Sequence, residues 1–470
     1  MNNTIDAIKN RVIRYFIPED PSLRIPVLIA FLLRVVPLLV WLDWPCVRDE
    51  CTYLRLSDRM VHGEGMTASN GWIWAPGYPF LLAVHQTLFG YAAGIKTTQS
   101  ILSVVFMNLI YRLAFRFSGD KRVAKWALLF YAFSPTQIFF AQSLWSECIY
   151  GGLLLVALDF FHRAYHQEES STGFFAYKDS IVTGILVGIC VLFRGVATYM
   201  LPIFAFALLW QQWRRLFVYK QAIMLMLSAI LVVAPYSLYA SKKFDGFMIS
   251  DRTLGQMMWL GNNDFAPITF DWGNGQLSNF AYQRHIAIGR EPCAGRNKPV
   301  ERDVCQTQEG VAWIKTHPQA FLERIPVRIA QMFNPHSFIT RHIRWGNWLG
   351  LPQFVDECIV VINVLWNLAV LWLGTWGLLR FAKTGNLILI AGIWLYHIVA
   401  ISMLAGLTRY RVPLEPFLMI YVGYVVVYGK KDIQENRRSL RFIGAVLATL
   451  LVAFFTLWFM PSGWVEWRHW

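Results

Sequence analysis

The chain has 470 residues, of which 56% are hydrophobic and only 15% are charged. A soluble domain averages about 45–50% apolar and about 25% charged residues, so this composition excludes an ordinary soluble protein and indicates one that a bilayer solvates. The formal net charge is +14, but the basic residues punctuate apolar runs instead of gathering on one polar domain, which argues against a nucleic-acid partner and favours contacts with membrane lipids.

The N-terminal residues 1–24 are polar and amphipathic, unlike a cleaved signal peptide. We predict that they form a cytoplasmic helix lying on the membrane surface. The rest of the chain divides into three expected parts. A transmembrane module at 25–240 contains a first outer loop at 43–96, an external region follows at 241–357, and C-terminal transmembrane helices occupy 358–470.

Apolar runs predict an all-α, polytopic integral membrane protein, because a helix needs about 20 mostly apolar residues to cross the hydrocarbon core. About eleven transmembrane helices are expected, or ten to thirteen depending on how short interrupted runs are counted. The predicted spans are 25–42, 97–117, 123–141, 145–162, 180–193, 196–211, 221–240, 358–379, 387–405, 412–428 and 441–460.

Basic residues in short connections predict the orientation of the chain in the membrane. Four such connections are rich in lysine and arginine, at 119–122, 213–220, 380–383 and 429–441. Placing all four in the cytoplasm lets every predicted span alternate sides. The first outer loop and the external region then open on the opposite face of a bacterial or archaeal plasma membrane.

Two adjacent carboxylates, Asp49 and Glu50, lie a few residues beyond the first predicted span. A carboxylate at that depth is partly desolvated, which suits it to act as a general base. Ordinary solvated acids beside lipid headgroups are the alternative explanation. Apolar residues at helical spacing over 53–60 predict an amphipathic helix along the interface. The sequence A-P-G-Y-P at 75–79 is expected to turn the chain back into the membrane.

Three motifs follow one another in this loop: R-D-E-x-x-Y from residue 48, G-x-G from residue 63 and P-G-Y-P-x-L-L-A from residue 76. Together they resemble the first loop of the GT-C membrane glycosyltransferases, most closely the protein O-mannosyltransferase and aminoarabinose (lipid A) transferase group. The resemblance implies a GT-C fold and a polyprenyl- or dolichyl-phosphate sugar donor. It also implies that Asp49 is the catalytic base with Glu50 beside it, and that Tyr53 and Tyr78 contact substrate.

Two positions depart from that group. Ala75 stands where many relatives have the first proline of P-P-G-Y. Thr52 stands where aminoarabinose transferases typically carry an arginine, so a contact to the donor phosphate must come from another part of the chain.

Two charged residues in apolar surroundings are candidates for that contact or for catalysis. Glu147 begins an apolar run and resembles the acid that faces the cavity in the fourth span of the group. It is expected either to orient the acceptor or a water molecule, or simply to complement the dipole of its helix. Arg194 interrupts another apolar run, where a charge is costly without a partner. It pairs with a buried acid or binds a lipid phosphate, and its expected place at the outer ends of two spans favours phosphate.

The segment L-T-R-Y-R-V-P-L-E-P at 407–416 resembles a further GT-C feature at the outer end of a late span. Arg409 and Arg411 carry planar, permanently charged groups that suit phosphate oxygens. Tyr410 between them suits the interface. Alternatively, both arginine side chains extend towards the lipid headgroups and bind no substrate. We predict that at least one of them contacts the donor phosphate.

In the external region, the segments 257–264 and 313–335 resemble parts of bacterial members of the group. They make Asn263 and His317 candidate contacts to acceptor or donor, although turn and capping roles explain both residues as well.

The cysteines and histidines give no metal-binding pattern. The histidines of the external region lack compact ligand spacing, so no metal site is predicted. Cys293 and Cys305 are candidates for a disulfide outside the cytoplasm, and Cys46 and Cys51 are a second, weaker pair.

These features predict an inverting glycosyltransferase that moves a sugar from a polyprenyl-phosphate donor to a lipid, glycan or protein acceptor on the non-cytoplasmic face, without a cofactor. Arg194, Arg409 and Arg411 are expected to stabilise the leaving phosphate. One alternative is a transporter or flippase of lipid-linked sugars, which needs a polar path through the whole bilayer. Another is a polymerase or oligosaccharide transferase that depends on a polyprenyl pyrophosphate.

Overall fold

The computed structural model describes residues 18–458 except 19, 43–44, 48, 68–71, 168–173, 211–213, 267–292, 294, 345, 347, 349 and 405–406. All regular elements among these residues are helices, and one isolated β-bridge joins Ile73 to Arg252. The all-α prediction is therefore confirmed. Most of the surface helix predicted at 1–24 lies outside the described residues.

Helices overlap every predicted span, and further helices lie between them. They are α2 (Arg24–Val35), α3 (Leu38–Trp41), α4 (Asp49–Val61), α5 (Gly77–Phe89), α6 (Ile95–Ser118), α7 (Lys121–Ala132), α8 (Pro135–Gln142), α9 (Glu147–Tyr165), α10 (Lys178–Phe193), α11 (Leu201–Leu209), α12 (Leu216–Lys243), α13 (Leu254–Gly261), α15 (Pro299–Thr316), α16 (Pro318–Phe333), α17 (Ser337–Arg344), α18 (Gln353–Phe381), α19 (Thr384–Met403), α20 (Glu415–Asn436) and α21 (Leu440–Trp458). The 3-10 turns are η1 (Pro21–Leu23), η2 (Ala92–Gly94), η3 (Phe174–Tyr177), η4 (Gly195–Met200) and η5 (Thr408–Tyr410).

Six helical segments in the described part of the chain are long and apolar enough to cross a bilayer by themselves. They are Pro21–Val40, Ala92–Ser118, Leu216–Lys243, Gln353–Phe381, Thr384–Met403 and Leu440–Trp458. A seventh results if α8 and α9, which meet at 113°, form one broken span. The number of eleven spans stays a prediction, because the remaining helices at predicted spans are shorter or, in α20, more charged.

The predicted span 123–141 is two helices, α7 and α8. Ser134 caps α8, its hydroxyl accepting a hydrogen bond from the Gln137 N–H at 3.4 Å, and Pro135 follows at the first helical position. Proline has no N–H to continue the preceding helix, so α7 ends before it. The short α8 is followed by a turn at 143–146, and α9 begins after this turn at Glu147.

The helices pack closely where glycine removes a side chain. A Cβ at Gly184 of α10 would overlap the carbonyl oxygen of Leu225 in α12, and one at Gly188 would crowd Ala229 one turn further along. Small residues four apart let helix backbones approach in this way inside membranes. On the outside, α21 leaves large apolar side chains more than half exposed, as expected for a surface that lipid covers.

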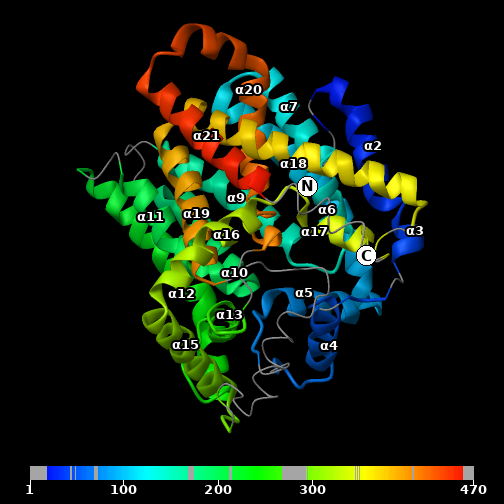
Figure 1. Ribbon diagram of the computed structural model, residues 1–470, viewed down its shortest axis with the longest axis vertical. Helices are drawn as coiled ribbons and strands as arrows, with labels where there is room; N and C mark the ends of the chain where they lie inside the picture. The colour runs from blue at the N-terminus through cyan, green and yellow to red at the C-terminus, as the bar shows by residue number, and fades with distance from the viewer. Residues whose placement is uncertain are drawn as a thin grey trace, which may run out of the picture.

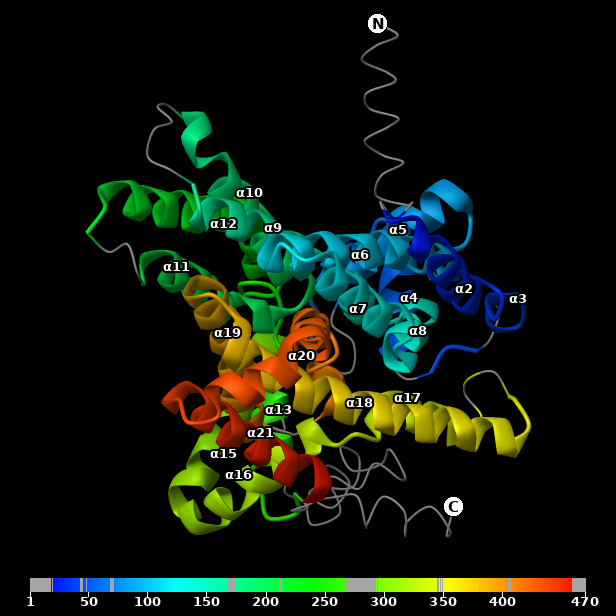
Figure 2. The same ribbon diagram turned by 90° about the horizontal axis from the view of Figure 1, so that it is seen from above.

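The two outer pieces of the chain lie at the same end of the helical bundle. In Figure 1, α4 and α5 of the first outer loop and α13 and α15 of the external region all occupy the lower end, whereas the connection between α20 and α21 is at the upper end. The view from above in Figure 2 places α18 and α21 beside each other and α12 beside α10. The basic connection 429–441 and the first outer loop therefore lie at opposite ends of the protein.

Candidate active site

Asp49 is the first residue of α4 and lies against an arginine from far along the chain. Its Oδ2 accepts a hydrogen bond from the Arg409 guanidinium at 2.7 Å. Arg409 Nε also lies 3.5 Å from Glu147 Oε1, and the same oxygen accepts a hydrogen bond from Arg194 at 2.5 Å. Two carboxylates and two guanidinium groups thus alternate in one row, at the starts of α4 and α9, directly after α10 and in η5.

This alternation satisfies charges that would otherwise be costly to bury. The Glu147 side chain is fully buried and that of Arg194 is 10% exposed, so each needs the other. Burial lowers the pKa of Arg409, but the Asp49 and Glu147 carboxylates outweigh burial and hold that pKa above its usual value. Arg194 therefore does pair with a buried acid, which was one of its two expected partners.

Aromatic rings hold the two guanidinium groups in place. The Arg409 guanidinium carbon lies 4.7 Å from the ring centre of Trp145, and that of Arg194 lies 5.6 Å from Tyr410 and 5.8 Å from Tyr150. Contacts of this type orient a cation over the face of a ring. The rings leave the guanidinium edges directed at carboxylates, so the row has a defined geometry before any ligand binds.

A cavity of about 750 Å³ opens beside this row. Of the residues predicted for the site, Asp49, Tyr53, Arg194, Arg409 and Tyr410 line it. Side chains that were not predicted contribute much of the remaining wall, among them Trp72, Trp74, Trp145, Asp251, Arg252, Asp303, Arg341, Tyr396 and His397. The cavity therefore combines the charged row with a largely apolar wall that includes three tryptophans.

The missed residues left a weak signal in the sequence. W-I-W at 72–74 and S-D-R at 250–252 each place polar or aromatic groups beside a membrane-facing helix, as R-D-E does at 48–50. The two segments are far apart in the sequence, and the bridge between Ile73 and Arg252 joins them in the folded protein.

Glu50 does not line the cavity but fastens the first outer loop to the helical bundle. Its carboxylate accepts hydrogen bonds from the Val47 N–H at 3.0 Å and from the Leu144 N–H at 2.9 Å. Burial raises the pKa of Glu50, and the two backbone N–H groups offset part of that rise. The predicted catalytic role is thus unsupported for Glu50, which instead positions α4 against the turn that precedes Glu147.

Three predicted substrate contacts also lie away from the cavity. Tyr78 is buried behind Tyr53 and donates a hydrogen bond to Gln99 at 2.8 Å. Asn263 caps the turn after α13, with its amide donating to the Trp259 carbonyl at 2.8 Å. His317 is exposed between α15 and α16 and stacks on Trp313. The turn and capping explanations fit the last two better than substrate contact does.

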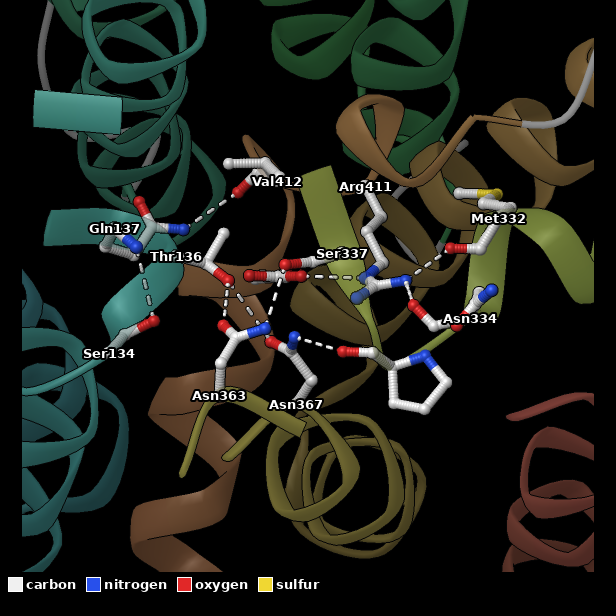
Figure 3. Close-up of polar contacts among 12 residues, drawn as sticks. Ser134, Thr136, Gln137, Met332, Asn334, Ser337, Asn363, Asn367, Arg411 and Val412 are labelled. Atoms are coloured by element: carbon white, nitrogen blue, oxygen red, sulfur yellow. Dashed lines mark hydrogen bonds and ion pairs between the residues drawn. The ribbon is translucent and has the colours of Figure 1, made fainter. Parts of the chain in front are cut away.

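Arg411 is buried on the other side of the segment that carries Arg409. It donates hydrogen bonds to Glu415 at 2.8 Å and to the carbonyl oxygens of Met332 and Asn334 at 2.6 and 2.7 Å (Figure 3). The segment is coiled as a 3-10 turn at η5, so side chains two residues apart are rotated by roughly 200–240° and point in nearly opposite directions. The predicted phosphate contact of Arg411 is therefore not supported.

A buried polar network surrounds Arg411 and anchors this segment. Gln137 of α8 donates to the Val412 carbonyl at 3.1 Å, as Figure 3 shows. Nearby, Thr136 donates to Asn363 at 2.9 Å, and Asn363 donates to Ser337 at 3.0 Å. Polar groups inside a membrane protein need such partners. The network holds residues 407–414 and so fixes the position of Arg409 next to Asp49.

We expect Arg411→Gln to lower the free energy of unfolding by about 3 kcal/mol or more, because it leaves the buried Glu415 carboxylate without its cation. Thermal unfolding of the purified protein in detergent measures the loss. The double variant Arg411→Gln/Glu415→Gln is the control, since it removes both charges and is expected to recover most of the stability. Equal melting temperatures for Arg411→Gln and the wild type would contradict the assignment.

Both candidate disulfides are formed. Cys46 joins Cys51 across the start of α4, and Cys293 joins Cys305 in the external region. Both therefore lie in the two outer pieces of the chain. Among the described residues, no three histidine, cysteine or carboxylate side chains gather into a metal-binding cluster.

Comparisons with known proteins agree with the fold. Residues 74–239 match the family model described as dolichyl-phosphate-mannose-protein mannosyltransferase. This segment contains Glu147 and Arg194 but ends before the external region. No curated protein gives a significant sequence match to the chain.

Solved structures share the architecture at low sequence identity. The archaeal oligosaccharyltransferase AglB from Archaeoglobus fulgidus, in complex with an inhibitory peptide and a dolichol-phosphate, is 16% identical, with a TM-score of 0.51 over 92% of this chain and 54% of that chain. Its apo form gives the same TM-score and coverage at 14% identity. ArnT from Cupriavidus metallidurans bound to undecaprenyl phosphate is 13% identical, with a TM-score of 0.42 over 88% of this chain and 80% of that chain. The chain spans about half the length of AglB, and the predicted GT-C fold is confirmed.

Proposed function

We propose that this protein is an inverting glycosyltransferase that takes a sugar from a polyprenyl-phosphate donor. The observation that carries the proposal is the contact between Asp49 and Arg409 on the wall of the main cavity. It places a candidate general base beside a permanent cation suited to a phosphate oxygen. The family match over residues 74–239 supports the same chemistry.

In the proposed reaction, the acceptor hydroxyl attacks the anomeric carbon of the donor sugar while Asp49 takes its proton. The bond between that carbon and the phosphate oxygen breaks, and polyprenyl phosphate leaves with the bonding electrons. Arg409 and Arg194 stabilise the negative charge that develops on the leaving oxygen. Attack from the side opposite the phosphate inverts the configuration at the anomeric carbon.

Donor binding also changes the surroundings of the proposed base. Arg409 is shared by Asp49 and Glu147 in this structure. A donor phosphate at Arg409 competes with Asp49 for its N–H groups. The weakened ion pair frees Asp49 Oδ2 to accept a hydrogen bond from the acceptor hydroxyl once the donor is bound. In this structure Glu147 also has Arg194 as a partner.

We also propose that the cavity faces the non-cytoplasmic side of the membrane. The disulfides Cys46–Cys51 and Cys293–Cys305 belong to the two outer pieces of the chain, and disulfides persist in oxidising compartments. The basic connection 429–441 lies at the opposite end of the bundle, as the positive-inside rule requires of a cytoplasmic segment.

Oligosaccharide transfer is the second candidate, because the structural match to the oligosaccharyltransferase AglB covers 92% of this chain. A flippase has less support. The charged groups that line the cavity come from α4, α15, α17, η5, the residue before η4 and the segment 250–252. In Figure 1, α4 and α15 lie at the lower end of the molecule and α17 lies near its middle, so these groups do not form a path from one end to the other.

The experiment that tests the proposal incubates the purified protein in detergent with a panel of polyprenyl-phosphate monosaccharides and candidate acceptors. We expect release of free polyprenyl phosphate from at least one donor, and a flippase would release none because transport produces no new species in detergent. A polyprenyl-pyrophosphate oligosaccharide added to the panel identifies the second candidate if it alone is consumed. Turnover is expected to persist in EDTA, because guanidinium groups already neutralise Asp49 and Glu147.

A further inference from the structure

The bridge between Ile73 and Arg252 brings together two cavity-lining segments that are far apart in the sequence. The Arg252 N–H donates to the Ile73 carbonyl at 2.8 Å, and the Ile73 N–H donates back to the Arg252 carbonyl at 3.4 Å. In extended chain, alternate side chains point to opposite faces. Ile73 is accordingly buried, whereas Trp72 and Trp74 stack on each other, 5.7 Å apart, and line the cavity.

The carboxylate of Asp251, next to this bridge, also lines the cavity and is held in one position. It accepts hydrogen bonds from the Gly195 N–H and from the Thr253 hydroxyl, the latter at 3.4 Å. A Cβ at position 195 would overlap this carboxylate, so only glycine allows the approach. Burial and the nearby Asp303 carboxylate raise the pKa of Asp251 to about 6. Such a group gains from a ligand that donates hydrogen bonds to it.

Ser250 adds a polar group without a partner. Its side chain is 1% exposed and lines the cavity, and its hydroxyl makes no hydrogen bond within the described part of the protein. A buried hydroxyl that lacks a partner usually meets water or a ligand. Ser250 and Asp251 therefore give this wall of the cavity unused hydrogen-bonding capacity next to two indole rings.

Asp251 lies close to the charged row. It accepts its backbone hydrogen bond from Gly195, the residue directly after Arg194, and the charge of Arg194 offsets part of the rise in the pKa of Asp251. Both residues line the same cavity, so a sugar attached to a phosphate at Arg194 and Arg409 shares the cavity with Asp251.

The chemistry of this wall matches that of a saccharide. A sugar ring has an apolar face of C–H groups, which packs on indole rings, and an edge of hydroxyl groups, which donate hydrogen bonds. Indoles offer large rigid surfaces for such packing, and hydrogen bonds to a carboxylate are among the stronger ones.

We propose that Trp72, Trp74, Ser250 and Asp251 form the subsite that binds the sugar ring of the donor. The ligand class is a monosaccharide with one apolar face and free hydroxyl groups on the edge that meets Asp251. This inference rests on the proposed function, since it takes the phosphate of the donor to lie at Arg194 and Arg409.

The test compares the binding of two kinds of lipid to the full-length protein in nanodiscs. One is undecaprenyl phosphate, and the other is a set of undecaprenyl-phosphate monosaccharides, from which the one that the wild type binds most tightly is used. We expect Asp251→Asn to weaken binding of the sugar-bearing lipid about tenfold, the loss of roughly one charge-assisted hydrogen bond. Binding of undecaprenyl phosphate itself is expected to stay within about twofold, a change below 0.5 kcal/mol.

Two further variants make the result specific. Trp72→Ala removes one of the two stacked indole rings from a partly exposed position. We expect it, like Asp251→Asn, to weaken binding of the sugar-bearing lipid and to leave binding of undecaprenyl phosphate nearly unchanged. Asp264→Asn is the matched control, because Asp264 is an exposed carboxylate of the external region that contacts Trp313 outside the cavity lining. It is expected to bind both lipids as the wild type does.

Three results of the binding measurements would overturn the subsite. In the first, Asp251→Asn weakens binding of both lipids equally. In the second, Asp251→Asn binds both lipids as the wild type does. In the third, the wild type itself binds the sugar-bearing and the sugar-free lipid equally well. A rise in acceptor KM alone, with donor binding unaltered, would also do so, because the subsite would then belong to the acceptor. The proposed function is judged separately by turnover of the wild type, so the two ideas fail by different observations.

Discussion

Asp49→Asn is expected to abolish detectable sugar transfer while leaving the protein folded. General base catalysis contributes about 10²–10⁴-fold to a rate, and the amide cannot accept the proton of the acceptor. The substitution keeps the size of the side chain and removes only its charge. Initial rates of polyprenyl phosphate release, measured with the best donor of the panel, give the size of the loss.

Binding measurements separate a missing base from a damaged site. The variant is expected to bind undecaprenyl phosphate at least as tightly as the wild type, because Arg409 no longer shares its charge with Asp49. Asp58→Asn is a suitable control, since Asp58 is an exposed acid on the same helix α4. Full activity in Asp49→Asn would remove the assignment of this residue as the base.

Arg409→Gln is expected to lower transfer by about 10²–10³-fold, the usual cost of removing one group that stabilises developing negative charge. It should also weaken binding of undecaprenyl phosphate, because the variant loses one of the two guanidinium groups proposed to bind the phosphate. Titration of the lipid and initial rates at saturating donor measure the two effects. Arg409→Lys keeps the charge but lacks the planar guanidinium group. We therefore expect this variant to recover only part of the transfer rate and part of the lipid binding.

The comparison with Arg411 tells a binding residue from an anchoring one. Arg411→Gln should lose thermal stability, whereas Arg409→Gln should lose lipid binding at a melting temperature close to that of the wild type. If both variants showed the same profile, the division of roles between these two arginines would be incorrect. Unaltered lipid binding in Arg409→Gln would argue against a phosphate at this position.

Much of the fold follows from hydropathy and the positions of a few residues. The run predicted at 145–162 is α9 at Glu147–Tyr165, and the interfacial helix expected after Asp49 is α4. These predictions succeed because an apolar run of bilayer length has few alternatives to a helix. The break within 123–141 was missed, although Ser134 and Pro135 carry a recognisable start signal for a helix.

The sequence by itself determined that Asp49, Arg194 and Arg409 lie near one membrane face, because the alternation of apolar runs sets the depth of each residue. Only the tertiary structure decided which of them meet. Glu50 and Arg411 each lie next to a cavity-lining residue, yet both point into the protein core, where Leu144 and Glu415 hold them. Trp72 and Asp251 share a wall because a bridge joins segments about 180 residues apart. Hydropathy reports how deep a residue lies but not the direction in which its side chain points, and that direction depends on partners that are distant in the chain.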